Sequence, residues 1–521
     1  MPNEPATPTA TPPTAHAAFP SIGTLAGAEL RVAAGDVAAA EFERASTRAL
    51  AWVRDYLADP ERYPVLSTAR PGDVRAALPA SPPAEPEPLD RILDDFERIV
   101  LPGITHWNHP GFFAYFSISA AGPGIIGELL AAALNVNGML WKTSPSATEL
   151  EQLSLDWLRQ LLGLGDGWFG MITDTASIST MLALAAAREA RPELAIRELG
   201  LAGRPDLPAM RVYCSEHAHS SIDKGAITLG LGHNNVVKVP CDDEFRMRPD
   251  ALRRLIEADV LAGYLPIACV ATVGTTSVTS IDPVPAILEI CRAHDVWLHV
   301  DGAYGGVAGL VPEMRDYLAG VDGADSLVVN PHKWLFTPVD CSAFYTRRPE
   351  VLKRAFSIVP EYLVTAEGSS GIDAPVDYMD YGVQLGHRFR ALKLWMVIRA
   401  FGATGLAERI RHHCALAREF AYRVEEEPGW ALCAPVPFSL VCFRYAPEGT
   451  TEGERNALNA RILSRVNDSG EAYLSHTKLG ASYVLRLAVG NVRTEWRHVE
   501  RAWELLREAA EAMRPDRPSA I

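Results

Sequence analysis

The stretch Ser326-Leu327-Val328-Val329-Asn330-Pro331-His332-Lys333-Trp334 places a lysine shortly after an apolar run. The run Ser326–Val329 predicts a buried strand, because it offers no polar face. A charged side chain at the end of such a strand must be exposed, paired or used in chemistry, since burial of an isolated charge is unfavourable. The role of Lys333 therefore bears on both the fold and the function of the chain.

The sequence on the N-terminal side of this strand alternates short β-rich runs with helical segments. Apolar strands that alternate with helices are typical of a parallel sheet covered by helices on both faces. We therefore expect an α/β fold with a mainly parallel sheet. The predicted strands are Met210–Cys214, Ile267–Val273, Val296–Val300 and Ser326–Val329, and helices are predicted at Pro249–Glu257 and Val284–His294.

The two ends of the chain differ from this central region. The N-terminal segment is rich in Pro, Thr and Ala and lacks the basic start and apolar core of a signal peptide, so we interpret it as a disordered tail. Helical periodicity then appears from about Asp36 to Leu57 and from Leu89 to Val100. Near the C-terminus, long amphipathic helices accompany predicted strands at Phe438–Arg444 and Tyr483–Leu487. The expected parts are a tail (1–24), an N-terminal helical arm (25–120), a large domain (121–391) and a smaller C-terminal α+β domain (392–521).

Composition excludes several classes of partner. The formal net charge of −15 argues against binding to a nucleic-acid backbone. The eight cysteines form no CxxC motif, so we expect buried free thiols and a reducing, cytoplasmic location. No run of 18 or more apolar residues predicts a membrane span. We therefore expect a cytoplasmic protein with neither nucleic acid nor membrane as a partner.

Small hydroxyl residues follow the apolar run Phe169–Ile172, and a helix through Met181 to Arg188 comes next. Ligands of open α/β sheets bind beyond the carboxyl ends of the strands. Free backbone amides and the positive end of the helix dipole in the stretch Thr173–Ser177 would suit a phosphate group. Ordinary capping of the helix by Ser or Thr is the alternative interpretation.

Polar residues also follow the other predicted strands. His217 and His219 come after one strand, Thr275 and Thr276 after another, and Asp301 after a third. The two histidines could bind a metal, but no third ligand has suitable spacing, and a single histidine that stacks on a flat ligand fits as well. Asp301 is either a helix cap or a functional carboxylate, and the small residues around it would let a planar ligand approach closely.

The predicted sheet brings Lys333 and Asp301 to the same edge. A lysine that forms a Schiff base, beside an aspartate that pairs with a pyridine nitrogen, is characteristic of a pyridoxal 5'-phosphate site. Each of these residues alone is more often structural. Their convergence with a phosphate cradle and a stacking histidine predicts a pyridoxal phosphate enzyme.

The segment Asn330–Trp334 resembles the lysine motif of the group II pyridoxal-phosphate-dependent decarboxylases, and of the aromatic-L-amino-acid decarboxylases in particular. The resemblance runs from about Asp36 to Glu511. It implies the fold of the type I pyridoxal-phosphate-dependent transferases. The other matching segments are Thr105–Phe116, Ser144–Glu151, His219–Ser221, His299–Asp301 and Leu385–Arg390.

The resemblance implies roles for individual residues. Lys333 would form the Schiff base, Asp301 would keep the pyridine nitrogen protonated, and His219 would stack on the ring. The other cofactor contacts that it implies are Ala176, Ser177, Thr276, Ala303, Asn330, His332 and Gly386.

Tyr362 lies beside a segment that we expect to be a mobile lid, because Thr365–Asp373 is rich in Gly and Ser. The resemblance implies that Tyr362 donates a proton to the carbon that CO₂ leaves. Relatives with Phe at this position lack the donor, and dioxygen then leads to an aldehyde and ammonia. Without the resemblance, a surface aromatic residue beside a proline is the simpler interpretation.

The expected substrate pocket departs from that of aromatic-specific relatives. In those relatives Phe-Ala-Tyr-Phe is commonly followed by Pro and a small hydroxyl residue, whereas Ser117 and Ile118 follow here. Asn137 and Met139 stand where aliphatic and Phe residues are frequent. The reaction type is therefore better defined than the substrate. The expected pocket residues are Phe112, Tyr115, Phe116, Ser117, Asn137 and Met139.

We expect a decarboxylase that converts an L-amino acid to the primary amine and CO₂. Aromatic pocket residues favour an aromatic substrate. The arm, together with the segment Val136–Trp141 that the resemblance places in the partner's site, predicts a homodimer with shared active sites. The alternatives are a decarboxylase of another amino acid, an aminotransferase-like enzyme, and a non-catalytic binding protein of the same fold. The presence of both Lys333 and Asp301 disfavours the last of these.

Overall fold

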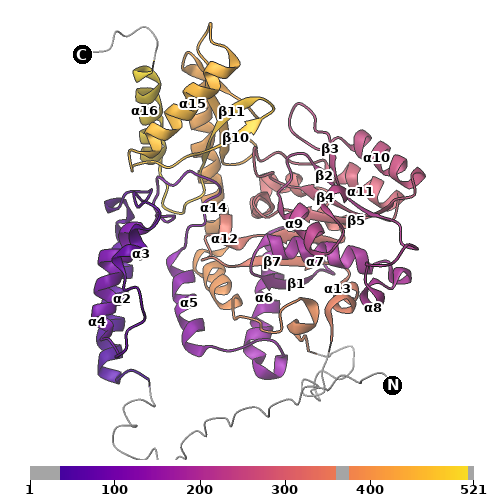
Figure 1. Cartoon of the computed structure of the whole chain (residues 1–521), viewed down its shortest axis with the longest axis horizontal. Coiled ribbons are helices and arrows are strands. Elements are labelled where there is room, and N and C mark those ends of the chain that lie inside the picture. Colours follow the sequence, from indigo (N-terminus) through magenta and orange to yellow (C-terminus); the bar gives the residue numbers. More distant parts are fainter. Residues whose placement is uncertain (1–35, 359–374, 514–521) are drawn as a thin grey trace, which may run out of the picture. The chain divides into compact units, whose positions relative to one another are not determined.

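The larger sheet has seven strands in the order β1-β7-β6-β5-β4-β2-β3 in the computed structural model, which describes residues 36–358 and 375–513 (Figure 1). Neighbouring strands from β3 to β6 pair in parallel, whereas β7 runs antiparallel to both β6 and β1. The prediction of a mainly parallel sheet is confirmed. The strands are β1 (Phe169–Thr173), β2 (Met210–Ser215), β3 (Val236–Val239), β4 (Leu265–Thr272), β5 (Trp297–Asp301), β6 (Ser326–Val329) and β7 (Ser342–Thr346).

The strands predicted from apolar runs lie where we expected them. β6 has the predicted bounds, and β5 begins and ends one residue later than predicted. Both strands are buried along their whole length, as expected for strands covered on two faces. The register pairs Thr272 with Asp301 and Asp301 with Val328, so the carboxyl ends of β4, β5 and β6 meet at one edge of the sheet.

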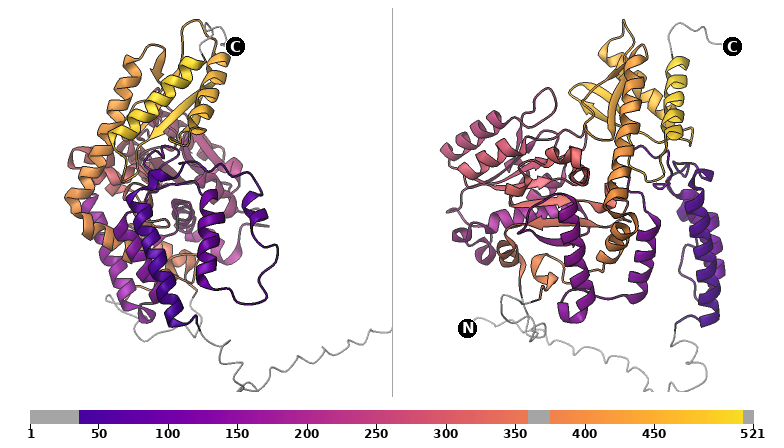
Figure 2. Two further views of the ribbon diagram at one scale, coloured as in Figure 1. Left: turned by 90° about the vertical axis from the view of Figure 1, so that its left-hand side faces the viewer. Right: turned by 180° about the vertical axis from the view of Figure 1, so that it is seen from behind.

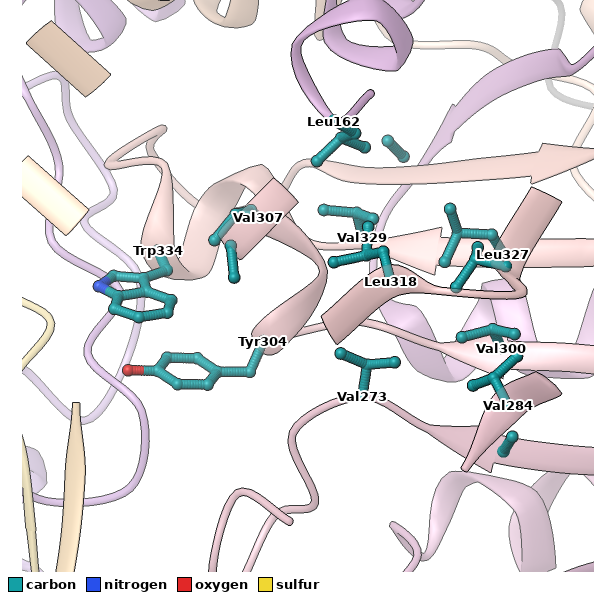
Figure 3. Close-up of a cluster of buried hydrophobic side chains, with 14 of the residues drawn as sticks. Leu162, Val273, Val284, Val300, Tyr304, Val307, Leu318, Leu327, Val329 and Trp334 are labelled. Atoms are coloured by element: carbon teal, nitrogen blue, oxygen red, sulfur yellow. The ribbon is translucent and has the colours of Figure 1, made fainter. Parts of the chain in front are cut away.

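Helices cover both faces of this sheet (Figure 1). Side chains of α7, α9 and α13 pack on one face, and those of α6, α10, α11 and α14 pack on the other. Figure 3 shows part of the hydrophobic cluster on the face covered by α6, α10, α11 and α14. There Val300, Leu327 and Val329 of the sheet lie near Leu162 and Val284. The helices of this region are α5 (Gly122–Leu134), α6 (Pro145–Leu161), α7 (Ala176–Glu189), α8 (Ile196–Leu199), α9 (Ser221–Thr228), α10 (Pro249–Leu261), α11 (Val284–Ala293), α12 (Pro331–Trp334), α13 (Pro349–Phe356) and α14 (Ala391–Glu426).

A second, antiparallel sheet follows in the order β10-β11-β9-β8. The C-terminal half of α14 packs on this sheet with α15 and α16, and α14 is broken at Gly402 (φ 64°). Figure 2 shows α14 running from the helices of the larger sheet to the smaller one. Strands near the two predicted positions are confirmed. The elements are β8 (Trp430–Leu432), β9 (Leu440–Tyr445), β10 (Ser475–Leu479), β11 (Ser482–Ala488), α15 (Glu452–Asn467) and α16 (Trp496–Ala512).

Both sheets belong to one compact unit, and residues 36–56 with 70–102 form a second, helical unit. In the helical unit, the Trp52 ring meets the Phe96 ring edge-on with 5.2 Å between centroids, and Arg48 pairs with Asp94 and Glu97. The two helices predicted in this part of the chain are present. The helices are α2 (Ala39–Ala58), α3 (Asp73–Ala77) and α4 (Leu89–Asp95), the last continued by a π-helical turn, Phe96–Val100.

Some sequence predictions fall outside the described residues, namely the N-terminal tail and the segment that contains Tyr362 and Thr365–Asp373. The eight cysteines are all described, and all are free thiols; six are buried, and Cys241 and Cys433 are half-buried. Among the helices of residues 36–358 and 375–513, none combines the length and the apolar character that a membrane span requires.

Candidate active site

A cavity of about 210 Å³ lies at the carboxyl ends of the strands. It is the edge at which β4, β5 and β6 end, and the first turn of α7 and the short helix α12 complete its wall. Nearly all the cofactor-binding residues expected from the sequence line it. The lining residues are Phe116, Thr175, Ala176, Ser177, His219, Thr272, Gly274, Thr276, Asp301, Ala303, Tyr304, Asn330, His332 and Lys333.

Lys333 is half-buried in this wall, in the short helix α12 that follows β6. Its Nζ lies 5.5 Å from the centroid of the Phe116 ring. Burial lowers the pKa of the Lys333 ammonium, and the nearby Asp301 carboxylate opposes that shift. A lowered pKa increases the neutral fraction of the amine, and the neutral amine is the form that attacks an aldehyde. Lys333 is therefore suited to form a Schiff base.

Asp301 and His219 present a carboxylate and a flat ring to the same cavity. Asp301 ends β5, and its Oδ1 accepts a hydrogen bond from the Ala303 amide at 3.0 Å, which fixes the carboxylate. His219 Nδ1 accepts a hydrogen bond from the Ser221 amide at 3.1 Å. Burial lowers the pKa of His219, so the ring is neutral and carries its proton on Nε2. A neutral, oriented imidazole can stack on a planar ligand without adding charge.

The cavity wall also offers hydrogen-bond donors. Ala176 and Ser177 open α7, and the amides of a first helical turn have no acceptor within their own helix. Asn330 Oδ1 accepts from Ser342 Oγ at 2.6 Å, which leaves the Asn330 amide NH₂ for the cavity. His332 Nδ1 accepts from the Cys341 amide at 2.9 Å, and burial lowers the pKa of His332 to about 3, so its Nε2 is a neutral donor. These donors suit a phosphate group.

Stacked aromatic rings build the apolar side of the cavity. Phe116 stacks on Tyr304 with 3.8 Å between ring centroids, and Tyr304 stacks on Trp334 at 4.7 Å. Figure 3 shows the Tyr304 and Trp334 rings lying nearly parallel. The Tyr304 hydroxyl lies 2.6 Å from Ser439 Oγ, and Trp334 Nε1 donates to His413 Nδ1 at 3.0 Å. Phe116 is therefore held as a rigid wall beside Lys333.

Sequence reasoning missed Arg486, which stands in the predicted strand Tyr483–Leu487. Arg486 is only 4% exposed, and its guanidinium donates to the Thr276 carbonyl at 2.7 Å and to the Ser277 carbonyl at 3.0 Å. The guanidinium carbon lies 5.6 Å from the Phe116 ring centroid. Arg486 thus ties β11 of the smaller sheet to the turn after β4. The one feature of the sequence that could have pointed to Arg486 is its charge inside an otherwise apolar predicted strand.

Asp282 was missed as well. Its buried carboxylate accepts hydrogen bonds from the amides of Thr272 at 2.8 Å and of Met247 at 2.7 Å, and so fixes the end of β4 beside the cavity. Burial raises the pKa of Asp282 to about 6. Nothing in its local sequence distinguishes it from a surface aspartate before a proline.

Several expected pocket residues do not line the cavity within the described part of a single chain. Phe112 is buried against Trp107, with 4.3 Å between ring centroids, and Tyr115 is half-exposed, with a positive φ of 53°. Ser117 is buried, and the expected cofactor contact Gly386 lies beside Asn137. Asn137 and Met139 form a separate cluster with residues 377–388. Their roles at the site stay predictions, as does that of Tyr362.

Comparisons with known proteins agree with this geometry. The model of the pyridoxal-dependent decarboxylase conserved domain matches residues 71–446. Tyrosine decarboxylase 3 of Petroselinum crispum is 39% identical, with 91% of this chain and 93% of that protein covered. A phenylacetaldehyde synthase of Arabidopsis thaliana is also 39% identical, over 88% of this chain and 94% of that one. The crystal structure of Oryza sativa TDC with PLP and tryptamine has a TM-score of 0.87 at 36% identity, covering 92% and 99% of the two chains.

Proposed function

The chain belongs to the pyridoxal-dependent decarboxylase family, and we propose that it removes the α-carboxylate of an aromatic L-amino acid to give the primary amine and CO₂. The observation that carries this proposal is the single cavity shared by Lys333, Asp301 and His219. An amine with a lowered pKa, a fixed carboxylate and a neutral stacking ring are the groups that pyridoxal phosphate chemistry needs.

The residues of the cavity fit the cofactor. Lys333 would bind its aldehyde carbon, and Asp301 would face its ring nitrogen, where a carboxylate stabilises the protonated form. The phosphate would lie at Ala176 and Ser177, with Asn330 as a further donor. When bound, pyridoxal phosphate supplies an electron-accepting ring for the electron pair left behind by CO₂. The apolar rings of Phe116 and Tyr304 would limit the water that reaches the bound substrate.

An aromatic substrate is supported by the aromatic wall of the cavity. The Phe116 ring, held by Tyr304, offers a surface on which a substrate ring can pack. Similar proteins are named tyrosine, tryptophan and aromatic-L-amino-acid decarboxylases. The same cavity could serve a decarboxylase of another amino acid, and the assay below separates these two candidates.

We also propose that the enzyme is a homodimer in which each subunit contributes to the partner's site. Along α5, Ile126, Leu129, Leu130 and Leu134 are 46–61% exposed and recur at helical spacing on one stripe. An exposed apolar stripe of this kind is typical of an interface. The segment Val136–Trp141 follows this helix directly, and none of its residues lines the cavity in the described part of its own chain.

Sedimentation equilibrium tests the homodimer, with an expected mass of twice 56.6 kDa. A fully active monomer would rule out shared sites. A cytoplasmic location is part of the proposal, because free thiols persist in a reducing compartment.

The test of the activity is a product assay on the purified enzyme loaded with pyridoxal phosphate. Tryptophan, tyrosine, phenylalanine and non-aromatic amino acids are supplied separately, and amine and CO₂ are measured by mass spectrometry. We expect amine and CO₂ in equal amounts from an aromatic substrate. Lys333→Ala should keep its circular dichroism spectrum but lose more than about a hundredfold in turnover. Release of CO₂ from non-aromatic substrates alone would contradict the aromatic assignment, and no release from any substrate would contradict the activity.

A further inference from the structure

The segment Asn137–Trp141 is fixed in place by its own chain, although it does not line its own chain's cavity. The His387 amide donates to Asn137 Oδ1 at 2.8 Å, and the Gly138 amide donates to the His387 carbonyl at 2.8 Å. The Trp141 amide donates to Asp377 Oδ1 at 2.8 Å. The backbone of His387 therefore holds both the Asn137 side chain and the Gly138 backbone at the start of this segment, and the position of that backbone depends on how the imidazole is anchored.

His387 is in turn held by a buried carboxylate. Its Nε2 lies 2.8 Å from Glu151 Oε2, and the Glu151 side chain is only 2% exposed. The other carboxylate oxygen, Oε1, accepts a hydrogen bond from the Ile172 amide of β1 at 2.7 Å. Tyr378 stacks on a face of the imidazole, with 4.7 Å between ring centroids. The ring is thus fixed at an edge and at a face.

Burial of the Glu151 carboxylate costs free energy, which its contact with His387 offsets. A buried carboxylate is tolerated only when it is paired, and the loss of its partner leaves a charge that the interior cannot solvate. Glu151 lies on α6, and His387 lies well over two hundred residues later in the chain. Their contact anchors a loop, because the His387 imidazole bonds to Glu151 while the His387 backbone bonds to Asn137 and Gly138.

We propose that Glu151 and His387 are positioning residues for the partner subunit's substrate pocket. The pair holds Asn137–Trp141 in the conformation that enters the partner's site, so its loss weakens substrate binding there without touching the cofactor. This inference rests on the proposed decarboxylase activity and on the proposed homodimer.

The first experiment tests whether residues 137–141 are held in place, and it does not depend on enzyme activity. Hydrogen exchange of the amides in residues 137–141 is compared in the wild-type enzyme, in His387→Ala and in His387→Gln. We expect faster exchange in His387→Ala and near wild-type exchange in His387→Gln, because Gln keeps a donor that can reach Glu151. His412→Ala removes an exposed histidine of α14 and should change nothing. Unchanged exchange in His387→Ala would overturn the positioning role.

The second experiment uses steady-state kinetics. His387→Ala should raise KM about tenfold or more with a smaller change in kcat, since the variant loosens residues that contact the substrate and leaves Lys333 and Asp301 in place. The dissociation constant for pyridoxal phosphate should stay at the wild-type value. His387→Gln should restore KM. A rise in the cofactor dissociation constant, or an unchanged KM, would overturn the proposal.

A mixed dimer decides which site the segment serves. One chain carries Lys333→Ala and an intact segment, and the other carries His387→Ala and an intact Lys333; two affinity tags isolate the heterodimer. If the segment enters the partner's site, the only competent cavity receives an intact segment, and KM returns to the wild-type value. A KM as high as that of the His387→Ala homodimer would overturn the assignment to the partner. Failure of the proposed activity is seen separately, as absence of CO₂ release by the wild-type enzyme.

Discussion

Similar proteins at 37–39% identity include decarboxylases and phenylacetaldehyde synthases, so overall similarity does not separate an amine product from an aldehyde. Residue 362 offers a chemical distinction. Tyr362 lies outside the described residues, and the resemblance implies that it donates the proton to the carbon that CO₂ leaves. A phenol is a suitable general acid, whereas a Phe ring has no proton to give.

We therefore expect Tyr362→Phe to lower amine formation by about a hundredfold, within the usual range for a general acid. Aldehyde, ammonia and peroxide should rise under air and disappear under nitrogen, while KM changes little. The measurement is the ratio of amine to aldehyde in the two atmospheres. Amine formation at the wild-type rate would show that Tyr362 is not the donor, and His219, which lines the cavity, would be the next candidate.

The residues of the site that could be predicted are those that follow a strand. Lys333, Asp301 and His219 were identified because the ends of parallel strands converge. Arg486 and the pair formed by Glu151 and His387 could not be found in this way. Their partners lie far away in the sequence, and only the packing of the folded chain brings Arg486 to the turn after β4 and His387 to Glu151.

Helix α5 shows how one element depends on its packing partner. A Cβ atom added at Gly127 would lie 2.7 Å from the Lys393 Cα of α14, whereas one at Gly122 would meet nothing within 4 Å. Alanine favours a helix interior over glycine by up to about 1 kcal/mol, a gain open to Gly127. Gly122 is the first residue of α5 and precedes Pro123, so little of this gain is expected there. At Gly127 the clash is with backbone, so the two helices must separate.

We expect Gly127→Ala to destabilise the enzyme by about 2 kcal/mol, in the range usual for overpacking. Gly122→Ala, in the same helix, should leave the midpoint of thermal unfolding nearly unchanged, because its Cβ would meet nothing within 4 Å. The measurement is thermal unfolding of both variants at one pH and one cofactor concentration. Equal shifts in the two variants would contradict close packing of α5 on α14.

The elements that could be predicted are those with strong local patterns. β5 and β6 were found because buried strands in an α/β sheet are apolar throughout. The direction of β7 could not be foreseen, since a strand buried on both faces has the same pattern whether it runs parallel or antiparallel. The break of α14 at Gly402 was equally hidden, because a single glycine inside a helical pattern is often tolerated.

At the scale of the whole molecule, the chain's response to acid follows from its buried histidines. Burial lowers the pKa of His109 and His299 to about 4 and that of His332 and His413 to about 3. Unfolding returns each ring to an ordinary pKa near 6.5. Between pH 6.5 and pH 4 the unfolded chain therefore binds protons that the folded chain does not. Stability from these rings is fully present above pH 6.5 and is lost as the pH falls through the folded pKa values.

The buried carboxylate of Asp282 changes the free energy of unfolding in the opposite direction, and it is one group against four. The pKa of Asp282 is raised to about 6, so the folded chain keeps this proton between roughly pH 4 and pH 6 while the unfolded chain releases it. Each group changes the free energy of unfolding by up to about 1.4 kcal/mol per pH unit within its own window. Since four rings oppose a single carboxylate, we expect the midpoint of thermal unfolding to fall steadily from pH 6.5 to pH 4.

His413→Gln isolates one of these contributions. In the wild type, His413 Nδ1 accepts a hydrogen bond from Trp334 Nε1 at 3.0 Å, and the ring also bonds to the Asn491 backbone. Glutamine can accept and donate at the same time, but it does not titrate. The variant should therefore have near wild-type stability at pH 7.5. Below pH 6.5 its free energy of unfolding should fall less steeply with falling pH, because unfolding takes up about one proton fewer than in the wild type. The measurement is urea unfolding of both proteins at several pH values between 5 and 7.5. Parallel slopes would show that His413 does not contribute to acid unfolding.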